Sequence, residues 1–194
     1  MAEELRVEVD RPYPVLIGRG ALDDLARVVP SDVTRVAVIF TPSVSALATT
    51  LVSHFHALAI EVPDAELAKT GAVLESCWDK LGAAGFTRND LIITVGGGAT
   101  TDLGGFVAAT WLRGIRVIHV PTSLLAMVDA AVGGKTGINI AAGKNLVGAF
   151  HHPTAVVCDL ALLDSLPARE LTQGMAEVVK CGFISDERIL EIVR

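Results

Sequence analysis

The sequence predicts an α/β fold in which a mostly parallel sheet is covered by helices. Short apolar runs typical of buried strands occur at residues 35–40, 59–62, 90–95 and 116–120. Between them, residues 43–57, 67–84 and 100–112 carry apolar side chains at helical spacing. Alternation of strand and helix is typical of a parallel sheet with helices on its faces.

The segments on either side of this alternation have patterns of their own. Residues 6–9 and 13–18 predict an N-terminal hairpin, and residues 123–132 an apolar helix. We expect a glycine-rich loop from there to about residue 149, then a buried strand at 155–160. A helix is expected to begin near Pro167, because proline suits the first position and Glu170 lies in the first turn. Residues 186–194 predict an amphipathic helix without a glycine cap, as in a domain cut from a longer chain.

The composition limits the class of protein. Of 194 residues, 51% are hydrophobic and 20% charged, which suffices for a buried core and excludes a disordered chain. The net charge of −6 argues against a nucleic-acid binder. Residues 36–60 carry no acidic or basic side chain, but serines, threonines and histidines interrupt them, so no membrane span is expected. Three cysteines without a paired spacing, and an acidic start in place of a secretion signal, favour the cytoplasm.

A glycine loop, Gly96-Gly97-Gly98, lies between a predicted strand and a predicted helix. Glycines let the backbone approach a ligand closely, and the amides of the helix start attract phosphate, so the loop suits a nucleotide diphosphate. The usual G-x-G-x-x-G pattern fails at Thr101, and a plain tight turn remains an alternative. Asp102 suits either a compensating charge for the helix dipole or an acceptor for ribose hydroxyls.

A second group of polar residues lies in a locally basic part of an acidic chain. Between residues 103 and 158 the net charge is +3, which suits a small anion. Asp129, Lys135, Lys144 and Asn145 lie within 17 residues, and they suit a phosphate, a hydroxyl and a proton acceptor, although loop lysines are commonly only solvated. A Walker A loop ending at Lys135 is not expected, because its first glycine is replaced by Asp129.

Glu177 and Lys180 are three residues apart and therefore share one helix face. A solvated ion pair is one interpretation. The apolar neighbours instead predict a largely buried helix, in which charged side chains are paired or bind a ligand.

These motifs together resemble the 3-dehydroquinate synthase family of sugar phosphate cyclases. The resemblance lies in GGGATTD at 96–102, WLRG at 111–114, PTSLLAMVDAAVGGKTGIN at 121–139, GKNLVGAFHHP at 143–153 and GMAEVVK at 174–180. It implies a Rossmann-like NAD-binding domain at residues 1–165 and the start of an α-helical metal and substrate domain at 166–194. It also implies a cytoplasmic homodimer that binds neither nucleic acid nor membranes.

The activity that the resemblance implies belongs to the shikimate pathway of chorismate and aromatic amino acid biosynthesis. The family is a carbon-oxygen lyase that converts the phosphorylated keto acid 3-deoxy-D-arabino-heptulosonate 7-phosphate into 3-dehydroquinate and phosphate. Its cofactors are NAD and a divalent metal, zinc or cobalt. We expect this chain alone to be poorly active or inactive, because the two zinc-binding histidines of the family belong to a later region.

The resemblance also implies roles for individual residues. Substrate-contacting positions are Lys135, Asp129, Asn145, Lys180 and Arg113, the arginine reaching a neighbouring subunit's site. The one metal ligand is Glu177. The NAD-binding positions are Asp64, Glu66, Lys69, Gly97, Gly98, Ala99, Thr100, Thr101, Asp102, Thr122, Ser123, Lys135, Lys144, Leu162, Leu163, Asp164 and Ser165. The loop at residues 40–43 lacks the family's usual acidic or amide residue and receives no role.

Three alternatives remain open at this point. The chain resembles, more distantly, other sugar phosphate cyclases and glycerol dehydrogenase-like enzymes with a similar glycine loop. A non-catalytic NAD-binding module is the alternative from another class. The retained Lys135, Asn145, Glu177 and Lys180 argue against the module, because a binding module needs no metal ligand or substrate lysines.

Overall fold

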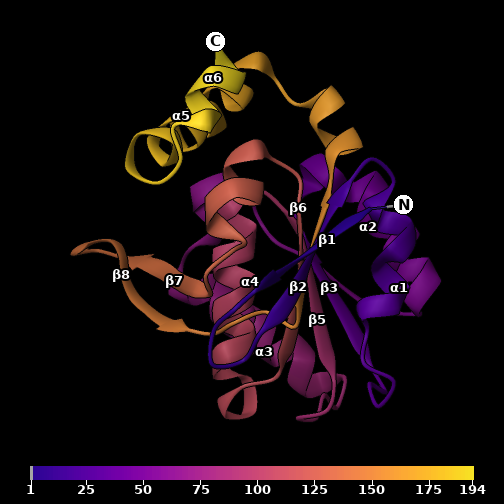
Figure 1. Ribbon diagram of the computed structural model, residues 1–194. Helices are drawn as coiled ribbons and strands as arrows, with labels where there is room; N and C mark the ends of the chain where they lie inside the picture. Colours follow the sequence, from indigo (N-terminus) through magenta and orange to yellow (C-terminus); the bar gives the residue numbers. More distant parts are fainter. Residues whose placement is uncertain (1) are drawn as a thin grey trace.

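The computed structural model describes residues 2–194 and confirms the α/β prediction (Figure 1). Its main sheet has seven strands in the order β1-β2-β9-β6-β5-β3-β4. Only β1 and β2 pair in antiparallel fashion, and the other neighbours are parallel. The strands are β1 (Glu3–Val7), β2 (Tyr13–Gly18), β3 (Val36–Phe40), β4 (Leu58–Glu61), β5 (Leu91–Gly96), β6 (Arg116–Pro121) and β9 (Ala155–Asp159).

Helices cover both faces of this sheet (Figure 1). One face packs against α1 (Leu25–Val28) and α2 (Ser45–Phe55), and the other against α3 (Gly71–Ala83) and α4 (Gly98–Thr110). Alternate residues of β3 serve the two layers: Val38 faces α1 and α2, whereas Ile39 faces α3 and α4. A strand buried on both faces needs an unbroken apolar sequence, which explains the runs that predicted the sheet.

Short helical turns complete the chain connections. They are η1 (Ala21–Asp24), η2 (Pro42–Val44), η3 (Ala65–Ala68), η4 (Trp111–Arg113), η6 (Leu160–Ser165) and the π-helical η5 (Ala126–Ala130). The expected apolar helix at 123–132 is therefore mostly a single π-helical turn. In the part of the chain that the structure describes, no helix has the length and apolar character needed to cross a bilayer.

The expectation of a glycine-rich loop up to residue 149 is wrong. These residues form a two-stranded antiparallel hairpin, β7 (Lys135–Ile140) and β8 (Gly143–Phe150), which lies against α4 and projects from the molecule (Figure 1). The glycines allow close strand pairing: a Cβ at Gly148 would lie 2.0 Å from the carbonyl oxygen of Thr136. The N-terminal hairpin is confirmed, although its first strand spans residues 3–7 in place of 6–9.

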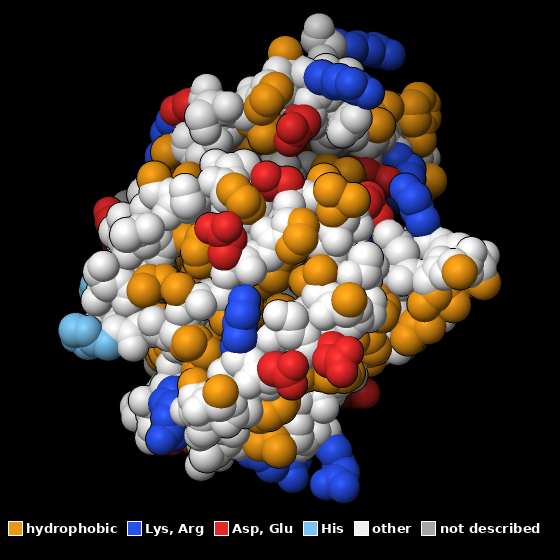
Figure 2. Space-filling view, turned by 180° about the vertical axis from the view of Figure 1, so that it is seen from behind, with side chains coloured by type: hydrophobic (Ala, Val, Ile, Leu, Met, Phe, Trp, Pro, Cys, Tyr) orange, Lys and Arg blue, Asp and Glu red, His pale blue; other side chains and the backbone are white. Residues whose placement is uncertain are grey.

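The hairpin exposes apolar side chains. Phe150 is 83% exposed and Leu146 61% exposed. Figure 2 shows orange side chains along this projection at the right of the molecule.

The last two helices are α5 (Ala168–Ile184) and α6 (Arg188–Val193), which lie beyond the carboxyl ends of the sheet strands (Figure 1). The prediction that α5 is largely buried is wrong, because only Gly174 and Gly182 are buried on it. Gly174 packs against Leu124, and most other side chains of α5, including Phe183, remain exposed. The apolar pattern was thus a correct sign of a helix but not of its burial.

We expect Gly104→Ala to destabilise the fold by about 1–3 kcal/mol through overpacking. A Cβ at Gly104 in α4 would lie 2.2 Å from Cγ2 of Thr94 in β5. Gly71→Ala is the matched control, because a Cβ there meets no atom within 4 Å. Urea unfolding of the two variants measures the difference, and equal free energies of unfolding would contradict the packing argument.

Candidate functional site

A cleft of about 840 Å³ opens where the carboxyl ends of the parallel strands converge. The segments after β3, β4, β5, β6 and β9 all contribute to its walls. Open α/β sheets bind ligands at this edge, where neighbouring connections run to opposite faces. The volume lies in the usual range for a small-molecule or cofactor site, about 300–1,000 Å³.

The start of α4 gives this cleft its chemistry. The amides of Thr100 and Thr101 donate to the carbonyl of Gly97, at 3.0 and 3.1 Å. Among the described residues, the amides of Gly98 and Ala99 are left as the free donors that a helix start carries. The positive end of the helix dipole and close backbone approach together suit a phosphate or diphosphate.

The structure brings most of the predicted NAD-binding residues to this cleft. Those that line it are Asp64, Glu66, Gly97, Gly98, Ala99, Thr100, Thr122, Ser123, Leu162 and Ser165. Thr101 is buried behind it, and Leu163 packs among apolar side chains. Asp164 forms a bidentate pair with Arg19 at 2.7 and 2.8 Å, and this hydrogen bonding lowers the pKa of its carboxyl.

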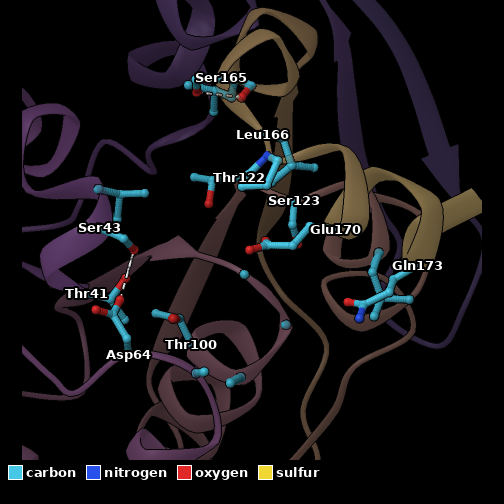
Figure 3. Close-up of a pocket in the computed structure, with 18 of the residues that line it drawn as sticks. Thr41, Ser43, Asp64, Thr100, Thr122, Ser123, Ser165, Leu166, Glu170 and Gln173 are labelled. Carbon is cyan, nitrogen blue, oxygen red and sulfur yellow. Dashed lines mark hydrogen bonds between the residues drawn. The ribbon is translucent and has the colours of Figure 1, made fainter.

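The cleft also contains residues for which no role was predicted. Ser43 donates to Asp64 at 2.9 Å, and Thr41 lies beside it in the loop after β3. Their position after a predicted strand was a usable signal, whereas nothing local marked Glu170 and Gln173, near the start of α5, as part of the cleft. Figure 3 shows Thr41, Ser43 and Asp64 on one side of the cleft and Ser123, Glu170 and Gln173 on the other.

A second pocket of about 460 Å³ lies between α4, η5 and the hairpin. It collects four of the predicted polar residues, Asp102, Asp129, Lys135 and Asn145. Apolar side chains such as Phe150 complete the lining. A lysine ammonium next to two carboxylates and an amide suits a small molecule that carries both an anionic group and hydroxyls.

A buried lysine connects the elements of this second pocket. Lys69, whose side chain is 3% exposed, donates to Oδ2 of Asp102 at 2.5 Å and to Oδ1 of Asn145 at 2.5 Å. Burial raises the pKa of Asp102, and the Lys69 ammonium opposes that rise. The Lys69 side chain points to Asp102 and Asn145. Its predicted contact with the NAD ribose stays a prediction.

The remaining predicted residues lie outside both pockets. Lys144 is exposed on β8, and Arg113 lies at the opposite end of α4 from the cleft. Glu177 and Lys180 form an ion pair on α5, which was one of the two interpretations of their spacing. The hydrogen bond from Lys180 to Glu177 raises the pKa of Lys180, and the negative charges of Glu177 and Asp129 add to the rise.

Residues 2–194 do not by themselves form a metal site. No group of three or more histidine, cysteine, aspartate or glutamate side chains there could hold an ion. A catalytic zinc needs about three protein ligands, so Glu177 alone does not suffice to hold one.

Comparison with known proteins identifies the family of this chain. The family model described as "3-dehydroquinate synthase N-terminal" matches residues 59–173, more than half of the chain. The chain belongs to the 3-dehydroquinate synthase family. It is 54% identical to a 3-dehydroquinate synthase of Nocardia farcinica over 100% of its length, and 58% identical to one of Streptomyces avermitilis over 94%. It covers 54% and 52% of those two proteins, so it spans about half the length of the curated relatives it matches.

Solved structures of sugar phosphate cyclases share the fold. A 2-deoxy-scyllo-inosose synthase complexed with carbaglucose-6-phosphate, NAD+ and Co2+ has a TM-score of 0.82 and 28% identity, covering 92% of this chain and 50% of its own. The 2-epi-5-epi-valiolone synthase ValA of Streptomyces hygroscopicus, with NAD+ and Zn2+ bound, has a TM-score of 0.79 and 26% identity, covering 95% and 53%. A probable glycerol dehydrogenase of Sinorhizobium meliloti, at 22% identity, shares the fold alone.

We expect Lys69→Met to destabilise the protein by about 3–5 kcal/mol, because it leaves Asp102 buried without its partner. Because the pKa of Asp102 is raised in the folded state, its carboxyl stays protonated there at pH values at which it is already ionised in the unfolded chain. Stability therefore falls as the pH rises from the unfolded pKa through the folded pKa. Without the Lys69 ammonium this pKa rises further, and the loss should be larger at pH 8 than at pH 5.

Urea unfolding at the two pH values measures this effect. Lys80→Met, which removes an exposed lysine of α3, is the matched control and should change stability little at either pH. If the loss of unfolding free energy in Lys69→Met were the same at pH 5 and pH 8, this would contradict the role given to the Lys69–Asp102 ion pair.

Proposed function

We propose that this chain forms the NAD-binding half of a 3-dehydroquinate synthase, a lyase of the shikimate pathway. The observation that carries the proposal is that the first turns of α4 border two different pockets. Gly98, Ala99 and Thr100 line the large cleft, and Asp102 lines the second pocket. An enzyme that oxidises and reduces its substrate through a dinucleotide needs its cofactor and substrate sites next to each other.

NAD suits the large cleft. The free amides of Gly98 and Ala99 are placed to hold the diphosphate, while Asp64 and Glu66 offer carboxylates to ribose hydroxyls. NAD, when bound, would supply the acceptor for a hydride from the substrate carbon that bears a hydroxyl, and it would later return that hydride. The 2-deoxy-scyllo-inosose synthase and ValA structures, both with NAD+ bound, support this assignment.

The phosphorylated keto acid suits the second pocket. We assign the substrate phosphate to the Lys135 ammonium and the substrate hydroxyls to Asp129 and Asn145. Asp102 lines the same pocket, and the buried Lys69 ammonium holds both Asp102 and Asn145 in place. The substrate implied by the family is 3-deoxy-D-arabino-heptulosonate 7-phosphate, and the products are 3-dehydroquinate and phosphate.

Further parts of the proposal concern the complete enzyme. We propose that residues 1–165 are the NAD-binding domain and that 166–194 begin a helical domain whose metal site includes Glu177. The Co2+ and Zn2+ in the related cyclase structures support a divalent metal. We also propose a cytoplasmic homodimer in which Arg113 serves the neighbouring site; the free cysteines Cys77, Cys158 and Cys181 support a reducing compartment.

The second pocket also argues against a non-catalytic NAD-binding module. A module that only binds NAD has no need for a separate pocket in which Asp102, Asp129, Lys135 and Asn145 converge. No observation of the fold favours glycerol dehydrogenase chemistry.

The complete enzyme should release phosphate from the heptulosonate phosphate in the presence of NAD and zinc. This chain by itself should bind NAD in calorimetry without turnover. Absence of phosphate release by the complete enzyme would overturn the proposed activity. A complete protein that binds NAD but binds neither the substrate nor zinc would favour the module.

Lys135→Met should lower kcat/KM for the heptulosonate phosphate by about 10–100-fold, because a charge-assisted contact with the phosphate is lost. The affinity for NAD should change less than about threefold, since Lys135 lies in the second pocket only. Steady-state kinetics and NAD titration of the complete enzyme measure both values, with Lys80→Met as control. A loss of NAD affinity as large as the loss of kcat/KM would show that Lys135 serves the dinucleotide instead.

A further inference from the structure

Asn139 connects the two pockets although it lines neither of them. Its side-chain amide donates to Oε2 of Glu66 at 2.6 Å, and Glu66 lines the large cleft. Its Oδ1 accepts from the backbone amide of Asn145 at 2.9 Å, and Asn145 lines the second pocket. A single half-buried side chain therefore uses both of its polar ends, one toward each pocket.

The bond to Asn145 acts on a strained part of the hairpin. The register of β7 and β8 shifts between Ile138 and Ile140, so that β8 carries extra residues at this point. Asn145 has a φ of 56°, a left-handed conformation that costs free energy for any residue other than glycine. Asn139 lies at this bulge, and its side-chain oxygen accepts a hydrogen bond from the backbone amide of Asn145. This bond replaces the strand-to-strand hydrogen bond that the bulge interrupts.

The conformation of Asn145 decides where its side chain points. With this backbone, Oδ1 of Asn145 accepts from the buried Lys69 ammonium, which also holds Asp102. The backbone amide of Asn139 in turn donates to the carbonyl of Lys69 at 2.8 Å. Asn139 therefore supports the second pocket through both Asn145 and Lys69.

The bond to Glu66 acts on the large cleft. Glu66 lies on the short helix η3 after β4 and is exposed, so no surrounding packing fixes its carboxylate. The Asn139 amide occupies Oε2 and orients the group, and Oε1 remains free to accept from a ligand hydroxyl.

We propose that Asn139 is a positioning residue that couples ligand binding in the large cleft to ligand binding in the second pocket. A ligand that orders Glu66 strengthens the Asn139 contact and thereby the conformation of Asn145, and by linkage the reverse holds equally. The identity of the two ligands rests on the proposed function, whereas the network itself rests on the hydrogen bonds alone.

A pair of substitutions separates the two ends of the side chain. Asn139→Asp keeps the acceptor for the Asn145 amide but replaces the donor to Glu66 by a carboxylate. Asn139→Ala removes both contacts. Asn89→Ala, an exposed asparagine in the turn before β5, is the matched control.

Amide hydrogen exchange at Asn145, measured in the complete enzyme without ligands, tests the first contact. Exchange should be at least about tenfold faster in Asn139→Ala, and close to the wild-type rate in Asn139→Asp and Asn89→Ala. Equal exchange in all four proteins would overturn the proposal, and this readout requires neither NAD nor turnover.

A double-mutant cycle tests the second contact. Asn139→Asp should weaken NAD binding about tenfold when residue 66 is glutamate, because two carboxylates then face each other. In a protein that already carries Glu66→Gln, the added Asn139→Asp change should weaken NAD binding less than about twofold. The reason is that the side-chain amide introduced at position 66 can donate to the new carboxylate at position 139. An equal cost in both backgrounds would overturn the assigned contact.

The coupling itself is measured with glycerol 3-phosphate as the probe of the second pocket, because it carries a phosphate for Lys135 and hydroxyls for Asp129 and Asn145. This probe should tighten NAD binding in the wild type and in Asn89→Ala, and the factor should fall to about one in Asn139→Ala. An unchanged factor would overturn the coupling. Phosphate release from the heptulosonate phosphate by the wild type is scored separately, so a failed proposed function and a failed role of Asn139 give different results.

Discussion

The buried ammonium of Lys69 is the interaction on which the arrangement of the second pocket depends. It joins three segments that are distant in the sequence: the loop after β4, the second turn of α4 through Asp102, and strand β8 through Asn145. A lysine is rarely this buried unless its charge is compensated. The carboxylate of Asp102 supplies that compensation, and the amide of Asn145 satisfies a further donor. The pair therefore fixes polar side chains at defined positions beside an otherwise apolar hairpin.

Close backbone packing makes this arrangement possible. The hairpin rests on α4 at Gly105, where an added Cβ would lie 2.4 Å from Cγ2 of Thr136 and 3.5 Å from Cε1 of His119. His119 is buried in the sheet with Nδ1 2.7 Å from Oγ1 of Thr94, and burial lowers its pKa to about 3. The histidine is thus a neutral core residue, not a ligand of either pocket. The glycines of α4 and the neutral Thr94–His119 pair beneath this helix let the hairpin approach α4 closely. Lys69 can therefore bridge the helix and the hairpin.

The two pockets differ in how their polar groups are held. The large cleft depends on backbone amides at the start of α4 and on short loops after the strands, which the parallel sheet positions automatically. The second pocket depends on side chains from separate elements, and Lys69 and Asn139 tie them together. Backbone donors do not depend on the identity of the neighbouring side chains. Side-chain networks lose their geometry when one member changes.

The sequence by itself determined the sheet and the position of the large cleft. Unbroken apolar runs have to be buried on both faces, and the glycine loop before α4 marks a helix start open to an anion. Local pattern also located α5, but it wrongly implied burial there and a loop where β7 and β8 pair. Tertiary structure alone separated the predicted residues into two pockets and placed Lys69, Asn139 and Asn145 in one network. The reason is that Lys69 meets Asp102 and Asn145 across 33 and 76 residues of chain. Periodicity and spacing describe which face a residue occupies, but only the packed chain decides which distant side chain it contacts.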